Sequence, residues 1–298
     1  MLNITETQSK NIVNIVGILK ELEIEEKTSA TGKDFVAGKA IVKVDQEING
    51  KVRECEIPVD IYANKLTNSG TSSKLYPMIV KYKEDFTALA ACPEDQPEFA
   101  SKVVISGASL NENTWIDQRT GQPVSSIRIR SNFINKVRDE YEPTATFEVT
   151  GVILNKIPEE KDGEPTGRLK VKLALVQYQG AVDVIDLVAE SEGAVNFIET
   201  NYEEGDTVNL TGKINMSRTT RTWYEEQGFG EPIKRQQTES CRELIILGGS
   251  PSGLEETYSY DANDIKAGLA ARTARVQELK NKQPQGRTQT PKTNSFGF

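Results

Sequence analysis

The side chains best suited to chemistry in this sequence are basic and aromatic ones spaced at alternate positions along short runs. In residues 102–137, Arg128 and Arg130 alternate with two isoleucines, and Trp115 stands in the polar segment before them. Because side chains alternate across a strand, this run has one apolar and one basic face. Basic grooves with aromatic rings on which bases stack bind nucleic-acid single strands. We therefore interpret 102–137 as a β-hairpin with a binding face and a long polar tip that carries Trp115.

Further basic and aromatic residues extend this hypothesis along the chain. The candidates in the first half are Lys39, Lys43, Tyr62, Trp115, Arg119, Arg128 and Arg130. The candidates in the second half are Arg168, Lys170, Lys172, Tyr178, Arg218, Arg221, Trp223 and Tyr224. Exposed lysines and arginines also occur on any solvated sheet face, and the segment around Trp223 also suits a dimerisation arm. On the sequence alone these alternatives stay open.

One feature of the first half opposes nucleic-acid binding. Glu54, Glu56 and Asp60 alternate with apolar residues and share their face with Tyr62. A groove that included this face would repel phosphates. The sequence therefore predicts either that this face points elsewhere or that the first half binds weakly and the second half dominates.

The composition bounds the class of protein. The chain has 298 residues and a formal net charge of −8, so a basic binding surface must be a local groove on an acidic body. It has no histidine, and its three cysteines form no Cys-x-x-Cys pair, so a structural zinc site of four Cys/His ligands cannot be assembled. The Gly-Gly-Ser-Pro-Ser-Gly stretch at 248–253 lacks the Gly-Lys-Ser/Thr of a P-loop. We therefore expect no enzyme activity, no metal and no cofactor.

The location predicted from the sequence is the cytoplasm. No apolar run approaches the roughly 18 residues that a membrane span needs. The polar start MLNITETQSKN is unlike a signal peptide, and an odd number of cysteines argues against a disulfide-stapled secreted protein.

Alternating runs predict strands in two similar series. The first series covers about 11–22, 34–48, 51–63 and the two arms of 102–137, with a two-residue turn at Asn49-Gly50. The second covers about 146–157, 168–178, 181–188, 207–216 and 241–247, with a short helix over 191–202. Gly17 and Gly107 of the first series match Gly151 and Gly212 of the second. We therefore predict a mainly β fold of two tandem five-stranded barrels.

The predicted domains follow from this repeat. The first covers 1–140 with an insertion at about 64–101, and the second covers 145–253 with a long hairpin at about 217–240. Residues 254–298 are predicted to form a helix over 261–282 and a disordered tail rich in Gln, Thr and Pro. The tail carries Phe296 and Phe298, which suit either a short peptide that binds replication partners or an unselected disordered end.

Several of these stretches resemble one family. The segments VVISGASLNENTWIDQRTGQPVSSIRIRSNF, YEEGDTVNLTGKI, NIVNIVGILKELEI and TFEVTGVILNKI resemble the OB-fold of bacterial-type single-stranded DNA-binding proteins. The tandem arrangement is more similar to such proteins of bacteriophages. The acidic part of that family's C-terminal tail is missing here, although Phe298 is present.

The resemblance implies a protein that coats and protects single-stranded DNA, without sequence specificity, in replication or recombination. It leaves open a homo-oligomer and protein partners that bind the tail. The alternative is a viral structural or assembly protein built from β-barrel repeats. A third interpretation is an adaptor whose barrels bind protein or RNA.

Overall fold

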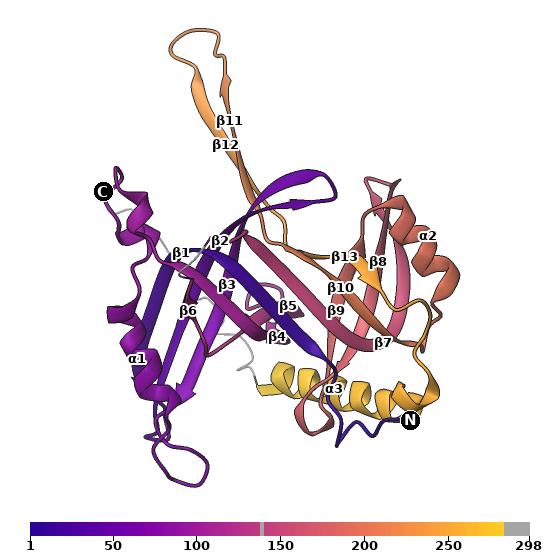
Figure 1. The fold of residues 1–298 in the computed structure, drawn as a ribbon. Helices are drawn as coiled ribbons and strands as arrows, with labels where there is room; N and C mark the ends of the chain where they lie inside the picture. The colour runs from indigo at the N-terminus through magenta and orange to yellow at the C-terminus, as the bar shows by residue number, and fades with distance from the viewer. Residues whose placement is uncertain (138–139, 283–298) are drawn as a thin grey trace, which may run out of the picture.

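The computed structural model describes residues 1–137 and 140–282 and is mainly β (Figure 1). This confirms the predicted fold class. Eleven strands belong to one continuous sheet, and the two strands of a long hairpin form a second, separate one. No helix among the described residues is long and apolar enough to cross a membrane.

The first half of the chain closes a ring of five strands. These are β1 (Asn11–Thr28), β2 (Asp34–Ile48), β3 (Lys51–Asn64), β4 (Lys102–Ile116) and β5 (Pro123–Arg130). In the ring β1 pairs with β2, β2 with β3, β3 with β5, β5 with β4, and β4 again with β1. The pair β3–β5 is parallel and the others are antiparallel. A short strand β6 (Asn135–Lys136) pairs with the beginning of β4 at the edge of the sheet.

The second half closes a ring of the same order. Its strands are β7 (Thr144–Lys161), β8 (Glu164–Val176), β9 (Val182–Ala189), β10 (Thr207–Asn215) and β13 (Glu243–Gly249). Here β7 pairs with β8, β8 with β9, β9 with β13 in parallel, β13 with β10, and β10 with β7. Between β10 and β13 the chain leaves the ring as the hairpin β11 (Arg218–Glu225) and β12 (Ile233–Ser240), which projects far from the rest of the molecule (Figure 1).

Alternation explains why these runs become strands. On β3, Cys55, Ile57 and Val59 are fully buried while the residues between them face outward. On β8, Leu169 and Val171 are buried in the same way, and the lysine between them is exposed. Buried residues of both rings form one continuous apolar cluster. Removal of this surface from water is the main favourable term in folding.

The duplication is visible in the strand register. Ile18 pairs with Lys43 on β1–β2, and Val152 pairs with Ala174 on β7–β8. The residues just before them, Gly17 and Gly151, each touch the neighbouring strand closely. A Cβ atom at Gly17 would lie 2.3 Å from the Lys43 carbonyl oxygen, and one at Gly151 2.5 Å from that of Ala174. The same close approach therefore requires glycine twice.

The two rings join through an antiparallel ladder between β1 and β7. At its centre Val13 pairs with Phe147, and these two residues hold the same position in their respective rings. Their neighbours Ile12 and Asn14 pair with Glu148 and Thr146. The ladder is therefore pseudo-twofold symmetric, as if two copies of one barrel met through their first strands.

Helices cover the open parts of the rings. The predicted insertion contains α1 (Leu75–Asp85) and two short 3-10 turns, Leu89–Ala91 and Pro97–Phe99. The predicted short helix is α2 (Glu192–Asn201), whose N-cap Ser191 accepts a hydrogen bond from the Ala194 amide. The long α3 (Ala262–Lys282) follows a 3-10 turn, Glu256–Tyr258, and lies on the side opposite the hairpin (Figure 1).

The structure differs from the sequence-based expectation in several details, three of them in the first ring. Strand β1 continues to Thr28, because Ile24 still faces the core and is only 6 % exposed. Strand β4 continues to Ile116, so Trp115 stands on a strand opposite Val124 and not in a loop. Gly107 is the extra residue of a bulge, with φ 70°, and Ala108, which pairs with Val13, is the counterpart of Gly212.

Candidate nucleic-acid interface

A groove of about 790 Å³ lies over the outer face of the first ring. Its floor consists of outward-facing residues of β2 and β3, and the β4–β5 hairpin forms one wall. The base of the β11–β12 hairpin, from the second half of the chain, forms the other. The basic and aromatic residues that line it are Lys39, Trp115, Arg128, Arg218 and Arg242.

Backbone contacts fix the base of the long hairpin against β3. The Glu56 amide donates a hydrogen bond of 2.8 Å to the Met216 carbonyl, and Cys55 forms an isolated β-bridge with Ser217. The Cys241 amide closes the base with a bond of 2.8 Å to the Ser217 carbonyl. The second half of the chain thus supplies a wall for a groove on the first.

Two residues of the acidic face of β3, Glu56 and Asp60, line this groove, and Glu54 does not. Each carboxylate has a basic partner: Glu56 lies 2.5 Å from the Lys20 ammonium, and Asp60 lies 3.2 Å from the Arg128 guanidinium. Among the described residues, four cations line the groove and only these two acids do. The repulsion expected from the sequence is therefore offset within the groove.

A second hollow of about 650 Å³ continues the groove along the same face. It shares Asp60 and Arg128 with the first and adds Arg130 and two aromatic side chains, Tyr62 and Phe133. These two rings are 50 % and 52 % exposed. The two hollows together form a track lined by both basic groups and aromatic rings, the combination with which proteins bind nucleic-acid single strands.

The aromatic rings of the track are held in place. Tyr62 packs on Phe35 with ring centroids 5.4 Å apart, and its hydroxyl donates a hydrogen bond of 2.7 Å to Asn64. Its amide donates to the Asn132 side chain at 3.0 Å. Trp115 is 42 % exposed on its strand. Both rings therefore offer a face to a ligand, and the Tyr62 ring does so without having to become ordered first.

The thiol at the edge of the groove is unreactive. Burial, together with the hydrogen bond to Glu243 and the charge of that residue, raises the pKa of Cys241 to about 12. Burial also raises the pKa of Cys55. A protonated thiol is a poor nucleophile, so the groove is suited to binding and not to thiol chemistry.

The structure brings together six of the residues predicted from the sequence. These are Lys39, Tyr62, Trp115, Arg128, Arg130 and Arg218. Lys43 instead pairs with Asp45 on its own strand at 3.3 Å. Arg119 is exposed in the turn between β4 and β5. Tyr178 follows β8 in the 3-10 turn Tyr178–Gly180 and is 70 % exposed.

The predicted basic strand of the second ring is engaged in ion pairs. Arg168 lies 2.9 Å from Glu159 and 2.7 Å from Glu243, and its side chain is only 23 % exposed. Lys170 lies 2.9 Å from Glu159, and Lys172 lies 3.6 Å from Asp186. The cations are where the alternation placed them, but each faces a carboxylate.

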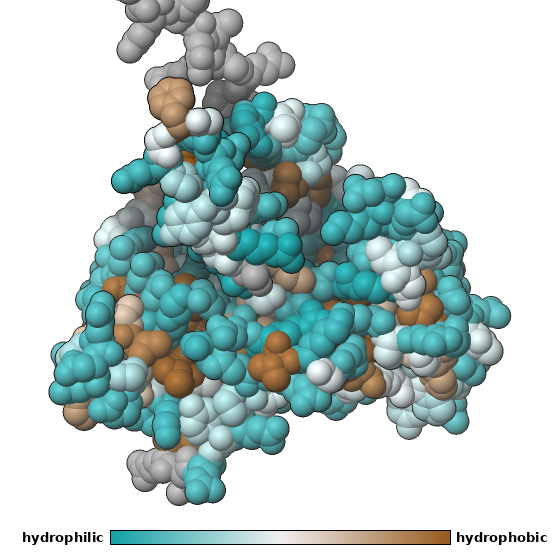
Figure 2. Space-filling view, turned by 90° about the horizontal axis from the view of Figure 1, so that it is seen from above, coloured by the Kyte–Doolittle hydropathy of each residue, from teal (hydrophilic) through white to brown (hydrophobic). Residues whose placement is uncertain are grey.

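The remaining predicted residues lie on the projecting hairpin, beyond the groove. Arg221 and Trp223 share one face of it, and Tyr224 lies on the other. The two aromatic side chains are 46 % and 66 % exposed. The side of the molecule from which the hairpin projects is mostly hydrophilic, with hydrophobic side chains in small separate groups (Figure 2).

Two residues of the track escaped the sequence analysis. Arg242 stands just before β13. Its position as a basic residue at the end of the long segment between β10 and β13 could have identified it as a candidate. Phe133 is a lone aromatic residue in a polar stretch after β5. Within the described part of the chain, no group of three or more His, Cys, Asp or Glu is arranged to hold a metal ion. Phe296, Phe298 and the predicted disorder of the tail lie outside the described residues.

Comparison with known proteins places the chain in context. The model of a family described as YorF matches residues 10–282. No curated protein matches the chain. Among solved structures, similar ones include a deletion mutant of the single-stranded DNA-binding protein from Thermus aquaticus, at 13 % identity and a TM-score of 0.48, covering 84 % of this chain and 97 % of that one. The wild-type form gives 12 % identity and a TM-score of 0.46, covering 82 % and 93 %. Likeness at this level carries no argument about function.

Proposed function

The chain belongs to the YorF family, and because that name states no activity, we propose its function from the groove: the protein binds single-stranded DNA. The strand lies in the track over β2, β3, β4 and β5 of the first ring. Its phosphates contact Lys39, Arg128, Arg130, Arg218 and Arg242, and its bases stack on Trp115, Tyr62 and Phe133.

The observation that supports this proposal most directly is the joint lining of the two hollows. Arg128 belongs to both, so one continuous path runs from the base of the long hairpin to Tyr62 and Phe133. Base stacking on such rings contributes about 1–3 kcal/mol per base and tolerates any sequence. The proposed binding is therefore independent of sequence, and it suits the coating and protection of strands in replication or recombination.

The test is a titration of the purified protein with oligo-dT. We expect quenching of tryptophan fluorescence, because Trp115 lines the groove, and a marked loss of affinity as salt rises. Each phosphate contact on a single strand should add roughly −0.7 to the slope of log affinity against log salt. Absence of binding at low salt, measured also by anisotropy of a labelled strand, would contradict the proposal. Competition with matched RNA measures the preference for DNA.

A second candidate function is assembly through the long hairpin. Phe229 at its tip is 91 % exposed, and such a protruding aromatic side chain suits a protein contact. Rings or filaments in electron microscopy without nucleic acid would favour this function. The cytoplasmic location, the bacteriophage type, the homo-oligomer and the partners of the tail remain predictions from the sequence.

A further inference from the structure

The two rings present different side chains at the same position of their outer faces. In the first ring Asp60 pairs with Lys39 on one side and Arg130 on the other. In the second ring Val188 holds the place of Asp60, and it pairs with Lys170 and Ile245. The row Lys39–Asp60–Arg130 is polar and open, whereas Val188 and Ile245 are 4 % and 0 % exposed. An outward-facing residue of a barrel is buried only if something covers it.

The cover comes from the first ring. Ile48, at the tip of the β2–β3 hairpin, forms a closed apolar cluster with Val188 and Ile245 and is itself fully buried. The β2–β3 ladder runs six pairs beyond Val42–Ile57, as far as Ile48–Lys51. The β8–β9 ladder runs only three pairs beyond the matching pair Leu173–Ile185. The first hairpin is therefore long enough to reach the face of the second ring, and the second hairpin is too short to return the contact.

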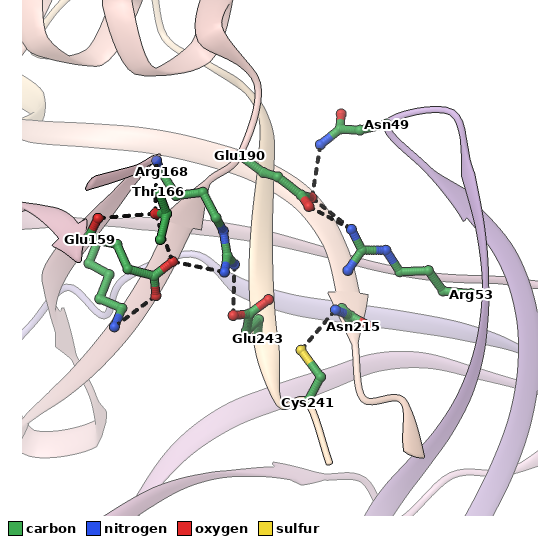
Figure 3. A network of polar contacts seen from close by, with 10 residues as sticks. Asn49, Arg53, Glu159, Thr166, Arg168, Glu190, Asn215, Cys241 and Glu243 are labelled. Carbon is green, nitrogen blue, oxygen red and sulfur yellow. Dashed lines mark hydrogen bonds and ion pairs between the residues drawn. The ribbon is translucent and has the colours of Figure 1, made fainter. Parts of the chain in front are cut away.

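Ion pairs fix this cover in place (Figure 3). Arg53 of β3 lies 2.7 Å from Glu190 at the end of β9, and both side chains are less than 20 % exposed. The Asn49 side chain donates a further hydrogen bond to Glu190 at 3.2 Å, beside the two that Arg53 donates. Burial would raise the pKa of Glu190, but the hydrogen bond and charge of Arg53 outweigh it and lower that pKa.

The neighbouring cations of the second ring are occupied as well. Arg168 lies between Glu159 and Glu243, and Glu243 stands at the position that Arg128 holds in the first ring. A cation that lines the groove in one ring is thus an acid in the other. Phosphate would have to displace carboxylates that are already paired and largely desolvated.

From this asymmetry we infer that each chain has a single strand-binding face, on the first ring, and that the matching face of the second ring is a permanent internal contact sealed by Ile48 and Arg53. The second ring contributes to binding through the base of its hairpin, with Arg218 and Arg242, and not through its own barrel face. This inference rests on the proposed binding of single-stranded DNA.

The experiment compares two lysines at the same register position. Lys39→Gln removes a cation from the groove, whereas Lys170→Gln removes its counterpart on the second ring, which is 50 % exposed and pairs with Glu159. We expect Lys39→Gln to weaken oligo-dT binding and to reduce the salt slope by roughly 0.7, the share of one phosphate contact. Lys170→Gln should change the affinity by no more than about twofold and should leave the salt slope unchanged. Circular dichroism of both variants checks that they fold.

Stoichiometry gives an independent readout. Titration with an oligo-dT of about eight nucleotides, a length within the range of one such fold, should saturate at one strand per chain. Saturation at two strands, or equal losses of salt slope in both lysine variants, would overturn the single-face inference while leaving DNA binding intact. A wild-type protein that fails to bind oligo-dT at all would overturn the proposed function and the inference with it.

Discussion

At the scale of single residues, Trp115 shows what alternation can and cannot predict. It was expected near a binding surface, and it lines the groove, but on strand β4 and not at the tip of a loop. Its strand neighbours Thr114 and Ile116 continue the ladder to Pro123, so the tip is shorter than the polar residues suggested. A strand position holds the ring more rigidly than a loop and reduces the ordering cost of stacking.

Replacement of Trp115 tests the stacking directly. Trp115→Leu should weaken oligo-dT binding by about 1–3 kcal/mol, the range for one stacked base, and Trp115→Phe should retain most of the affinity. Because no charge changes, the salt slope should stay the same in both variants. Anisotropy of a labelled strand is the appropriate measurement, since the substitution removes the tryptophan that lines the groove and leaves only Trp223. Wild-type affinity in Trp115→Leu would remove this ring from the proposed interface.

The pairing of individual charges was beyond prediction from the sequence. Alternation correctly placed Lys170 and Lys172 on an outward face, but not the acids opposite them. Glu243, which pairs with Arg168, is distant in the sequence and reaches it only because β13 closes the ring. An acid that arrives by ring closure leaves no local pattern. The sequence thus identified the basic faces but could not show which of their cations are paired with carboxylates.

At the scale of elements, the strands were the most predictable part of the fold. The β2 and β3 runs and the Asn49-Gly50 turn were placed within a residue, because alternation and left-handed turn residues are strong local signals. The insertion was the least predictable, since α1 has only 11 residues and a short apolar run of this kind suits a strand as well as a helix. The reach of the β2–β3 hairpin onto the second ring depends on ladder length relative to β8–β9, which requires both rings in space.

The projecting hairpin allows a prediction about this element alone. Its side chains on β12 are all exposed, and within residues 1–137 and 140–282 the strands β11 and β12 pair only with each other. Replacing residues 220–238 by an Asn-Gly turn should therefore change the free energy of unfolding by no more than about 0.5 kcal/mol, the usual range for surface changes. The groove wall, with Arg218 and Arg242, stays in place.

Binding by the shortened protein should then depend on strand length. An oligo-dT of about eight nucleotides, confined to the groove, should bind as to the wild type, whereas one of about 20 should lose affinity because it also contacts Arg221, Trp223 and Tyr224. Equal affinity for the long strand would indicate that the distal hairpin serves another purpose, and loss of an oligomer in sizing would identify that purpose as assembly. A lower melting temperature of the shortened protein would contradict the prediction that the hairpin contributes little to stability.

At the scale of the whole molecule, the pseudo-twofold ladder between β1 and β7 makes the chain an internal dimer whose two rings carry different side chains on their outer faces. Helix α3 stabilises one side of their junction. Arg272 forms a bidentate ion pair with Glu112 of β4, with one contact at 2.6 Å. Glu112 also accepts a hydrogen bond from the Val184 amide of β9 at 3.2 Å, and its amide donates to Asp183 at 3.0 Å. One carboxylate therefore connects both rings and the helix.

This junction predicts how stability depends on pH. Burial alone would raise the pKa of Glu112, but hydrogen bonds from Arg272, Ser125 and Val184 outweigh it and lower the pKa to about 2. Its stabilising contribution is therefore complete above the ordinary value of 4.5 and is lost as pH falls towards 2. By linkage, this contribution is on the order of 3 kcal/mol. Asp183 acts in the opposite direction: burial raises its pKa, so its contribution weakens as pH rises above 3.8.

Glu112→Gln should flatten the dependence of unfolding free energy on pH between about 4.5 and 2, as measured by urea unfolding at a series of pH values. It should also lower stability at pH 7, because Arg272 loses its anionic partner at a site where Glu112 is only 5 % exposed. The matched control is Glu25→Gln, which removes an exposed carboxylate from the outer end of β1. In this variant the loss of unfolding free energy between about pH 4.5 and 2 should remain. If Glu112→Gln loses as much stability between about pH 4.5 and 2 as the wild type, the carboxylate at the junction does not set the acid limit.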